Sequence, residues 1–217
     1  MDYEQARFNM IEQQIRPWEV LDPKVLDGLL KVKREDFVPS IYQSLAFVDM
    51  GIPLGHGETM WAPVIEARAL QAVQVGASDR VLEIGTGSGY LTALLAHQAQ
   101  SVVTVEIHAD LGGEAERRFH AHGLTNVHTR LGDAAHDWSS DGLFDVIVLT
   151  GSVPLPPEAY LKRLTPGGRL FAIVGEGPAM AATLFTCTTA HACLGVPLFE
   201  TVSKSLVNAT EPERFVF

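Results

Sequence analysis

Hydrophobic and polar positions change their period along the chain, and these changes predict the elements. Residues 3–16 carry apolar side chains at helical spacing, which predicts a first helix. A second helix is predicted over residues 23–33, because Asp22 suits the N-cap and Pro23 the first helical position. The two helices form a helical flank or lid at the N-terminus.

Residues 37–63 follow no clear period and are rich in glycine and proline. This stretch is expected to form an ordered loop region with room for one or two short strands. Loops of such length are often functional.

From residue 64 onward, segments with strand and helix patterns alternate. Strands are predicted at 80–84, 102–106, 126–130, 144–149 and 169–174, and helices at 64–75, 89–97, 110–122 and 157–163. Such alternation predicts an α/β fold, a doubly wound and mostly parallel sheet with helices on both faces. After a turn at 166–168 and the strand at 169–174, residues 180–189 and 196–207 predict a late antiparallel pair, which brings the sheet to seven strands.

The length of 217 residues and a hydrophobic share of 47% fit one folded domain over residues 1–217. Within it, residues 1–63 would supply the helices and the substrate and cofactor loop, and residues 64–217 the cofactor-binding core.

Charge and composition limit the kinds of partner and the compartment that we expect for this protein. The net charge of −10 disfavours nucleic acid, and no apolar run approaches the roughly 20 residues that span a bilayer. Cys187 and Cys193 cannot build a disulfide framework, and the first thirty residues contain no apolar signal core. A cytoplasmic protein is therefore expected, as a monomer or weak dimer. The closest histidines, His120, His122 and His128, lack metal-ligand spacing, so no metal is expected.

A candidate cofactor site lies at residues 81–90, where an apolar strand runs into a glycine turn and then a helix. Glycines allow close approach of a ligand to the backbone, and the following helix offers free N–H groups. A dinucleotide fingerprint requires its third glycine at position 90, where Tyr90 stands. The spacing favours S-adenosylmethionine, with a dinucleotide or a purely structural turn as alternatives.

Acidic residues at successive strand ends support this interpretation. Glu106 can accept both ribose hydroxyls, and Asp133 can accept the adenine amine or, alternatively, cap a helix. Thr150, Gly151 and Ser152 should border the transferred methyl group. The predicted cofactor-binding residues are Glu83, Gly85, Thr86, Gly87, Ser88, Gly89, Tyr90, Glu106, Ile107, Gly132, Asp133, Ala134, Thr150 and Gly151.

Several segments in order resemble the protein-L-isoaspartate O-methyltransferase family: residues 32–39, Asp49, residues 52–63, the glycine turn and residues 214–216. The resemblance implies a Rossmann-like methyltransferase fold. It also implies carboxyl methylation of isoaspartyl residues in damaged proteins or peptides, as a repair reaction.

The loop at residues 52–63 departs from the family pattern. Glu58 stands in place of a glutamine and Trp61 in place of a serine beside the isoaspartyl carboxylate, whereas Thr59 is kept. Thr59 and Trp61 are the predicted catalytic residues, with Thr59 orienting the acceptor; Trp61 could instead fill the core beside Met60. Direct displacement at a sulfonium needs alignment and exclusion of water rather than a strong base.

Two alternative functions remain open. One is a methyltransferase of the same fold that acts on another acceptor, either a small molecule or another protein, because a fold does not fix a substrate. The other is a cofactor-binding protein without catalysis.

Overall fold

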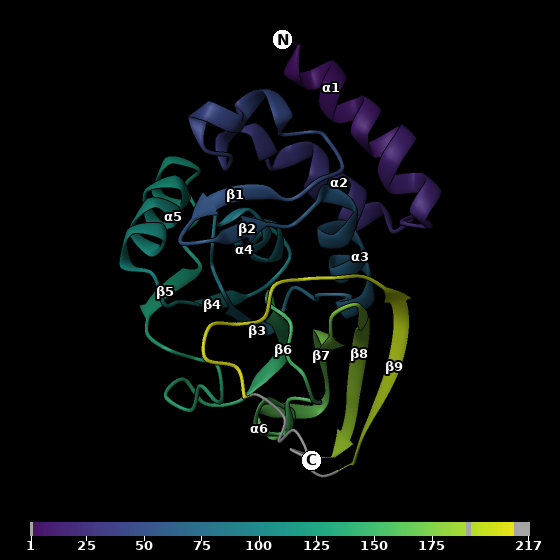
Figure 1. Cartoon of the computed structure of the whole chain (residues 1–217), viewed down its shortest axis with the longest axis vertical. Helices are drawn as coiled ribbons and strands as arrows, with labels where there is room; N and C mark the ends of the chain where they lie inside the picture. The colour runs from purple at the N-terminus through teal and green to yellow at the C-terminus, as the bar shows by residue number, and fades with distance from the viewer. Residues whose placement is uncertain (1, 190–191, 211–217) are drawn as a thin grey trace, which may run out of the picture.

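The computed structural model describes residues 2–189 and 192–210, and its N-terminal part is helical as predicted (Figure 1). Helix α1 (Tyr3–Met10) continues through a π-helical turn and a short 3₁₀ turn to residue 18. Helix α2 (Pro23–Lys31) begins at the expected cap, where the Asp22 carboxylate accepts the Lys24 N–H at 2.8 Å. Residues 214–216, which contribute to the family resemblance, lie outside the described residues.

The predicted loop region contains the expected short strands. After two 3₁₀ turns, β1 (Ile52–Gly55) and β2 (Glu58–Met60) pair as an antiparallel hairpin, in which His56 and Gly57 adopt positive φ angles. The hairpin lies between the N-terminal helices and the central strands of the sheet (Figure 1).

Seven strands form the main sheet, in the order β5-β4-β3-β6-β7-β8-β9. They are β3 (Arg80–Ile84), β4 (Ser101–Glu106), β5 (Val127–Leu131), β6 (Phe144–Leu149), β7 (Leu164–Glu176), β8 (Ala179–Thr189) and β9 (Ala192–Glu200). The first five in chain order pair in parallel, and β8 and β9 are antiparallel, as predicted. The strand order reverses between β3 and β6, which is where ligands bind in open α/β sheets.

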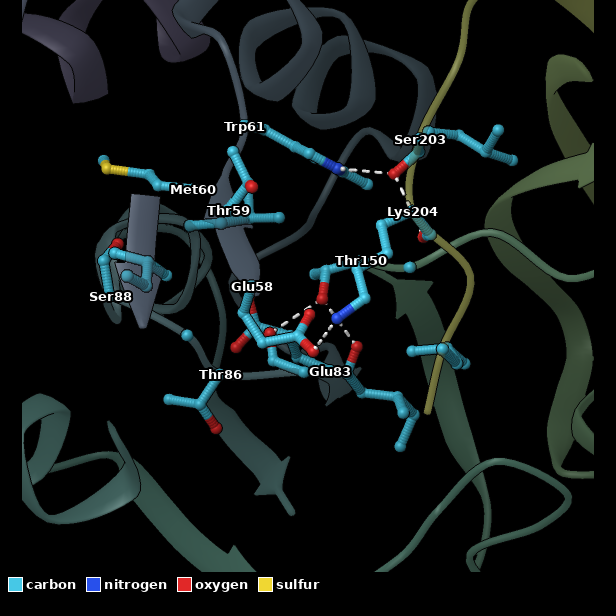
Figure 2. Close-up of a pocket in the computed structure, with 18 of the residues that line it drawn as sticks. Glu58, Thr59, Met60, Trp61, Glu83, Thr86, Ser88, Thr150, Ser203 and Lys204 are labelled. Carbon is cyan, nitrogen blue, oxygen red and sulfur yellow. Dashed lines mark hydrogen bonds and ion pairs between the residues drawn. The ribbon is translucent and has the colours of Figure 1, made fainter. Parts of the chain in front are cut away.

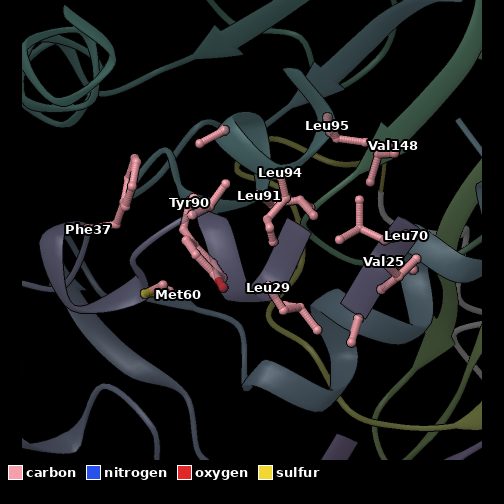
Figure 3. Packing of buried hydrophobic residues seen from close by; sticks show 14 of the residues in the cluster. Val25, Leu29, Phe37, Met60, Leu70, Tyr90, Leu91, Leu94, Leu95 and Val148 are labelled. Carbon is pink, nitrogen blue, oxygen red and sulfur yellow. The ribbon is translucent and has the colours of Figure 1, made fainter. Parts of the chain in front are cut away.

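Helices α3 (Pro63–Val73), α4 (Tyr90–Ala96), α5 (Ala109–Ala121) and α6 (Glu158–Leu161) connect the strands. The central strands are buried on both faces, so neighbouring residues enter different cores: Val81 faces α3 and α4, and Leu82 faces the side of α6. Figure 3 shows the larger core, in which Leu70 of α3 and Leu95 of α4 approach Val148 of β6. Each fully buried leucine contributes roughly 1.5–3 kcal/mol of transfer free energy, which fixes the sheet beneath the site.

The structure corrects one predicted strand. The strand expected at 196–207 ends at Glu200, and residues 201–207 leave the sheet. Ser152, three residues after the end of β6, donates its N–H to the Lys204 carbonyl at 2.8 Å, and its own carbonyl accepts the Leu206 N–H at 3.0 Å. The apolar residues that recur between 196 and 207 suggested a strand, but the backbone bonds to Ser152 hold the end of this segment away from the sheet.

Two smaller differences concern turns and cysteines. The predicted turn at 166–168 lies inside β7, where the pairing with β6 shifts register between Phe144 and Val146. Cys187 and Cys193, paired residues of β8 and β9, are joined in a disulfide. One such bond is not a disulfide framework.

Within the described residues, no helix is long and apolar enough to cross a membrane. The same part of the chain contains no cluster of histidine, cysteine and acidic residues suited to a metal ion.

Candidate active site

A cavity of about 530 Å³ opens at the carboxyl ends of β3, β4 and β6, and the β1–β2 hairpin and residues 201–207 border it (Figure 2). Its volume lies within the range of ordinary ligand pockets. It brings together most of the residues predicted from the sequence: Thr59, Trp61, Glu83, Gly85, Thr86, Gly87, Ser88, Glu106, Ile107, Gly132, Asp133, Ala134, Thr150 and Gly151.

Gly89, Tyr90 and Ser152 are the predicted residues that do not line the cavity, and Ser152 is fully buried. Gly89 ends the turn with a φ of 84° and caps α4. The side chain of Tyr90 points from α4 into the larger core, with its ring 5.7 Å from that of Phe37 and under the guanidinium of Arg34. Tyr90 therefore supports the site from below instead of contacting a ligand.

Gly85 and Thr150 form the base of the glycine turn. Gly85 has a φ of 95°, and a Cβ at this position would lie 2.2 Å from Thr150 Oγ1. That hydroxyl is shared between the carbonyl oxygens of Ile84 and Gly85, both at 2.8 Å. Thr150 thus holds the turn in place. Only glycine fits at position 85, because the backbone there has a positive φ and a Cβ would meet Thr150.

Glu83 is a buried carboxyl group at the floor of the cavity. Its Oε2 accepts hydrogen bonds from Thr92 and, at 2.6 Å, from Thr104, while its Oε1 has no partner among the described residues. Burial raises the pKa of Glu83 to about 8 despite these hydrogen bonds. A cationic ligand beside Glu83, such as S-adenosylmethionine, would favour the ionised form of this carboxyl group and so oppose the effect of burial.

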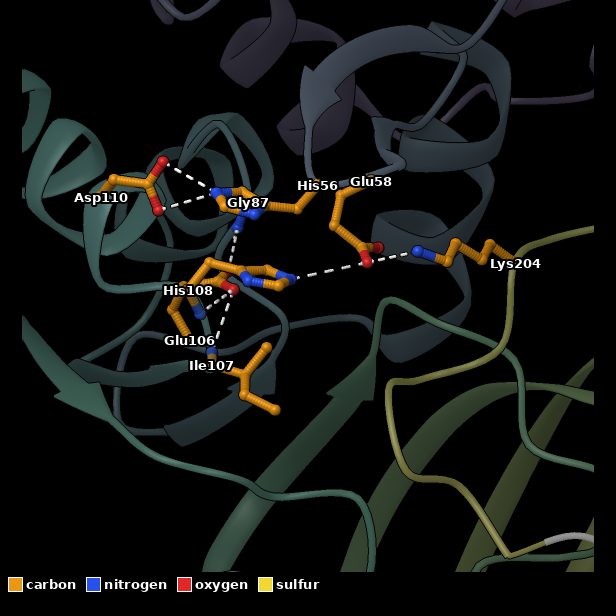
Figure 4. Close-up of polar contacts among 8 residues, drawn as sticks. All are labelled: His56, Glu58, Gly87, Glu106, Ile107, His108, Asp110 and Lys204. Atoms are coloured by element: carbon orange, nitrogen blue, oxygen red, sulfur yellow. Dashed lines mark hydrogen bonds and ion pairs between the residues drawn. The ribbon is translucent and has the colours of Figure 1, made fainter.

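Glu106 connects the end of β4 to the glycine turn (Figure 4). Its Oε2 accepts the Gly87 N–H at 2.8 Å, and its Oε1 accepts the N–H groups of Ile107 and His108, both at 3.0 Å. A carboxylate has about four acceptor sites, so one site on Oε2 remains for a ribose hydroxyl. Binding both hydroxyls, as predicted, requires Glu106 to release one backbone group.

Asp133 follows β5, the strand next to β4 in the sheet, and lines the cavity. No helix begins after it, so the alternative role as a helix cap is wrong. Its carboxylate accepts the Ala135 N–H at 3.0 Å and the Asn208 side-chain amide at 2.7 Å, and these bonds lower its pKa. Asp133 is ionised and exposed at the rim, where it can accept an amine.

Thr59 and Trp61 line the cavity from β2 and the residue that follows its end. The indole N–H of Trp61 donates to Ser203 Oγ at 3.3 Å, and its ring meets Phe171 edge-on at 6.1 Å between centroids. The ring of Trp61 packs against the core and its N–H reaches the cavity, and its catalytic role stays a prediction.

Arg34 fixes the backbone of this loop from within the protein. Its fully buried guanidinium donates to the carbonyl of Trp61 at 2.6 Å and that of Ala46 at 2.8 Å, and it pairs with Glu66. Burial raises the pKa of Glu66 to about 7, an effect that Arg34 opposes.

Sequence reasoning missed the contribution of residues 201–207. Ser203 and Lys204 line the cavity, and Lys204 Nζ lies 2.5 Å from Glu58 Oε1. His108 approaches the same carboxylate at 3.6 Å (Figure 4). The polar run Ser203 to Ser205 was the available signal, since it interrupts the apolar pattern of the predicted strand.

A parallel sheet with a glycine cradle, acidic groups at successive strand ends and a loop-covered cavity defines a class of protein, the nucleotide-cofactor methyltransferases with a Rossmann-like fold. Residues 5–191 match the family model described as Protein-L-isoaspartate(D-aspartate) O-methyltransferase. The chain belongs to this family, and its prediction as an S-adenosylmethionine-dependent methyltransferase is confirmed.

Individual relatives from the same family are also similar to this chain. The chain is 40% identical to a protein-L-isoaspartate O-methyltransferase of Picosynechococcus sp. over 169 residues, 78% of this chain and 76% of the relative. It is 38% identical to one of Caulobacter sp. over 180 residues, 83% of each. A solved Plasmodium falciparum structure, described as a protein-L-isoaspartate O-methyltransferase in complex with S-adenosyl-L-homocysteine, shares the fold with a TM-score of 0.80 and 21% identity over 95% of this chain and 98% of its own.

Proposed function

We propose that the chain transfers the methyl group of S-adenosylmethionine to the free carboxylate of isoaspartyl residues in peptides or proteins. The observation that carries this proposal is the single cavity that joins the glycine cradle to the family's acceptor loop at residues 52–63. The cradle supports the methyl donor, and the family of the chain supports the acceptor.

The chemistry requires two reactants in line and little else. A carboxylate oxygen attacks the methyl carbon, the carbon–sulfur bond breaks, and its electron pair returns to sulfur. The sulfonium becomes a thioether and the carboxylate a neutral ester, so no proton moves. The residues of this chain have to align the reactants and exclude water.

Each group at the cavity has a role in this alignment. The turn at Gly85, braced by Thr150, would hold the donor close to the backbone, and Glu83 would face its positive charge. Glu106 and Asp133 would accept ribose and adenine donors. Thr59 would orient the acceptor on the hairpin side of the cavity.

A radiolabelled methyl-transfer assay with an isoaspartyl peptide tests the proposal, with the same peptide containing normal aspartate as the control. We expect label only in the isoaspartyl peptide. Thr59→Val should reduce turnover, and unchanged turnover would remove Thr59 from the mechanism. S-adenosylhomocysteine at 100 times its Kd should raise the Tm by about 5–11 °C, because it adds about 2.7 kcal/mol.

Because Glu58 and Trp61 depart from the family pattern, an absence of isoaspartyl methylation would also be informative. Binding of S-adenosylhomocysteine without any methylation of the isoaspartyl peptide would favour a different acceptor. Binding with no transfer to any acceptor would favour a protein that holds the cofactor without catalysis.

A further inference from the structure

The two residues that depart from the family pattern contact adjacent residues of one distant segment. Glu58 pairs with Lys204, and Trp61 donates to Ser203, across sequence separations of 146 and 142 residues. Figure 2 shows both contacts crossing the same cavity from β2 to the segment after β9. The hairpin and residues 201–207 therefore form one acceptor wall.

From this arrangement we propose that Ser203 and Lys204 bind the acceptor carboxylate, with Trp61 positioning the Ser203 hydroxyl. The segment after β9 thus supplies the hydroxyl that is missing at position 61. This inference rests on the proposed function and names the groups that recognise its substrate.

The hydrogen-bonding geometry of Ser203 supports the assignment. Its Oγ accepts the indole N–H at 3.3 Å, which occupies one of its two lone pairs. The hydroxyl hydrogen points to the Lys204 carbonyl only over a long 3.4 Å contact. It is therefore available for a carboxylate oxygen in the cavity. Trp61 cannot replace a hydroxyl, but its N–H can orient one.

The backbone of the segment is held firmly enough to position these groups. The hydroxyl of the fully buried Ser152 donates to the Ser203 carbonyl at 3.0 Å, and the Ser152 N–H donates to the Lys204 carbonyl at 2.8 Å. Both residues are thus anchored to the end of β6, beside Gly151 of the cofactor region.

The charges around the cavity point to Lys204. Its lining contains the acidic side chains Asp49, Glu58, Glu106 and Asp133, besides Glu66 and Glu83, whose pKa values burial raises. Among the described lining residues, Lys204 is the one lysine or arginine. An acceptor carboxylate that enters this acidic surrounding requires a cation, and Lys204 is the group that can provide it.

Lys204 can bind the acceptor carboxylate and remain paired with Glu58 at the same time. The two side chains are 47% and 24% exposed, and ion pairs with that exposure contribute little to stability. An ammonium group has three donors, so it can bridge Glu58 and the acceptor carboxylate. Methylation turns the carboxylate into a neutral ester, which removes the attraction to Lys204 and favours product release.

Kinetics with an isoaspartyl peptide test the role of Lys204. Lys204→Met should raise the KM for the peptide about ten-fold or more, because a charge-assisted hydrogen bond is lost. Lys204→Arg keeps the positive charge, so its KM should stay close to that of the wild type. The affinity for S-adenosylhomocysteine, measured by calorimetry, should stay within about two-fold. The matched control is Lys31→Met, which breaks the surface pair with Asp27 and should leave the KM unchanged.

A double-mutant cycle tests the positioning role of Trp61. Trp61→Phe removes the N–H and keeps most of the ring; it should raise the peptide KM several-fold in the wild-type background and have no further effect in Ser203→Ala. Equal effects of Trp61→Phe in both backgrounds would overturn the positioning role.

The outcomes separate the inference from the function on which it rests. Peptide methylation by the wild type, with an unchanged peptide KM in Lys204→Met and Ser203→Ala, overturns the inference alone. Absence of methylation by the wild type overturns the proposed function and the inference with it.

Discussion

At position 85 the surrounding structure allows only glycine. Its φ of 95° is accessible to glycine at little cost, and Thr150 Oγ1 fills the space where a Cβ would stand. Thr150 has two functions here, because its hydroxyl holds the turn and the residue also lines the cavity. Ser88 is a further case, since its hydroxyl accepts the N–H of Tyr90 and also borders the cavity.

At this scale we predict that Gly85→Ala abolishes cofactor binding. The added methyl group must displace Thr150 and forces a strained backbone, so the affinity for S-adenosylhomocysteine should fall about 100-fold or more, as calorimetry can show. The control is Gly113→Ala in α5, where a Cβ meets no atom within 4 Å. That variant should keep full affinity and gain up to about 1 kcal/mol of stability. Equal affinities in the two variants would contradict the prediction.

At the scale of elements, the predicted bounds of a strand were accurate where its own sequence decides its position, and wrong where a distant residue does. Strands β3, β4 and β6 were predicted almost to the residue, because burial on both faces leaves continuous apolar runs. Strand β9 ends seven residues early, because the backbone of residues 203–206 bonds to Ser152 instead of to β8. Local pattern could not reveal that partner.

The anchoring of residues 201–207 leads to a second prediction. Ser152→Ala removes the hydroxyl that donates to the Ser203 carbonyl, a loss of about 1 kcal/mol. If this bond positions the acceptor wall, the KM for an isoaspartyl peptide should rise by up to about five-fold, with little change in S-adenosylhomocysteine affinity. Ser139→Ala, at an exposed position, is the matched control. A KM that remains at the wild-type value in both variants would speak against anchoring by Ser152.

At the scale of the whole molecule, buried carboxyl groups make stability depend on pH. Glu83 has a pKa of about 8 in the folded protein, against an ordinary value of 4.5. Between these values the folded protein holds a proton that the unfolded chain has lost, so stability falls as pH rises from about 5 to 8. Glu66, with a pKa raised to about 7, acts in the same direction.

We therefore predict that Glu83→Gln flattens this pH dependence. In thermal unfolding without cofactor, the wild type should lose more Tm between pH 5.5 and about 8.5 than the variant, since glutamine does not titrate. Glu116→Gln is the control, because its exposed carboxylate also accepts a threonine hydroxyl, that of Thr129. The control should follow the wild-type profile. An equally steep decline in Glu83→Gln would show that other groups are responsible.

The sequence by itself determined the order and type of most elements, the glycine cradle and the positions of Glu83, Glu106 and Asp133. These features depend on burial pattern and on backbone conformations that are specific to a few residue types, both of which are local. Tertiary structure alone decided that Tyr90 leaves the cavity, and that Ser203 and Lys204 enter it. Those positions depend on contacts with Arg34, Glu58 and Trp61, far away in the chain, and no local period records such contacts.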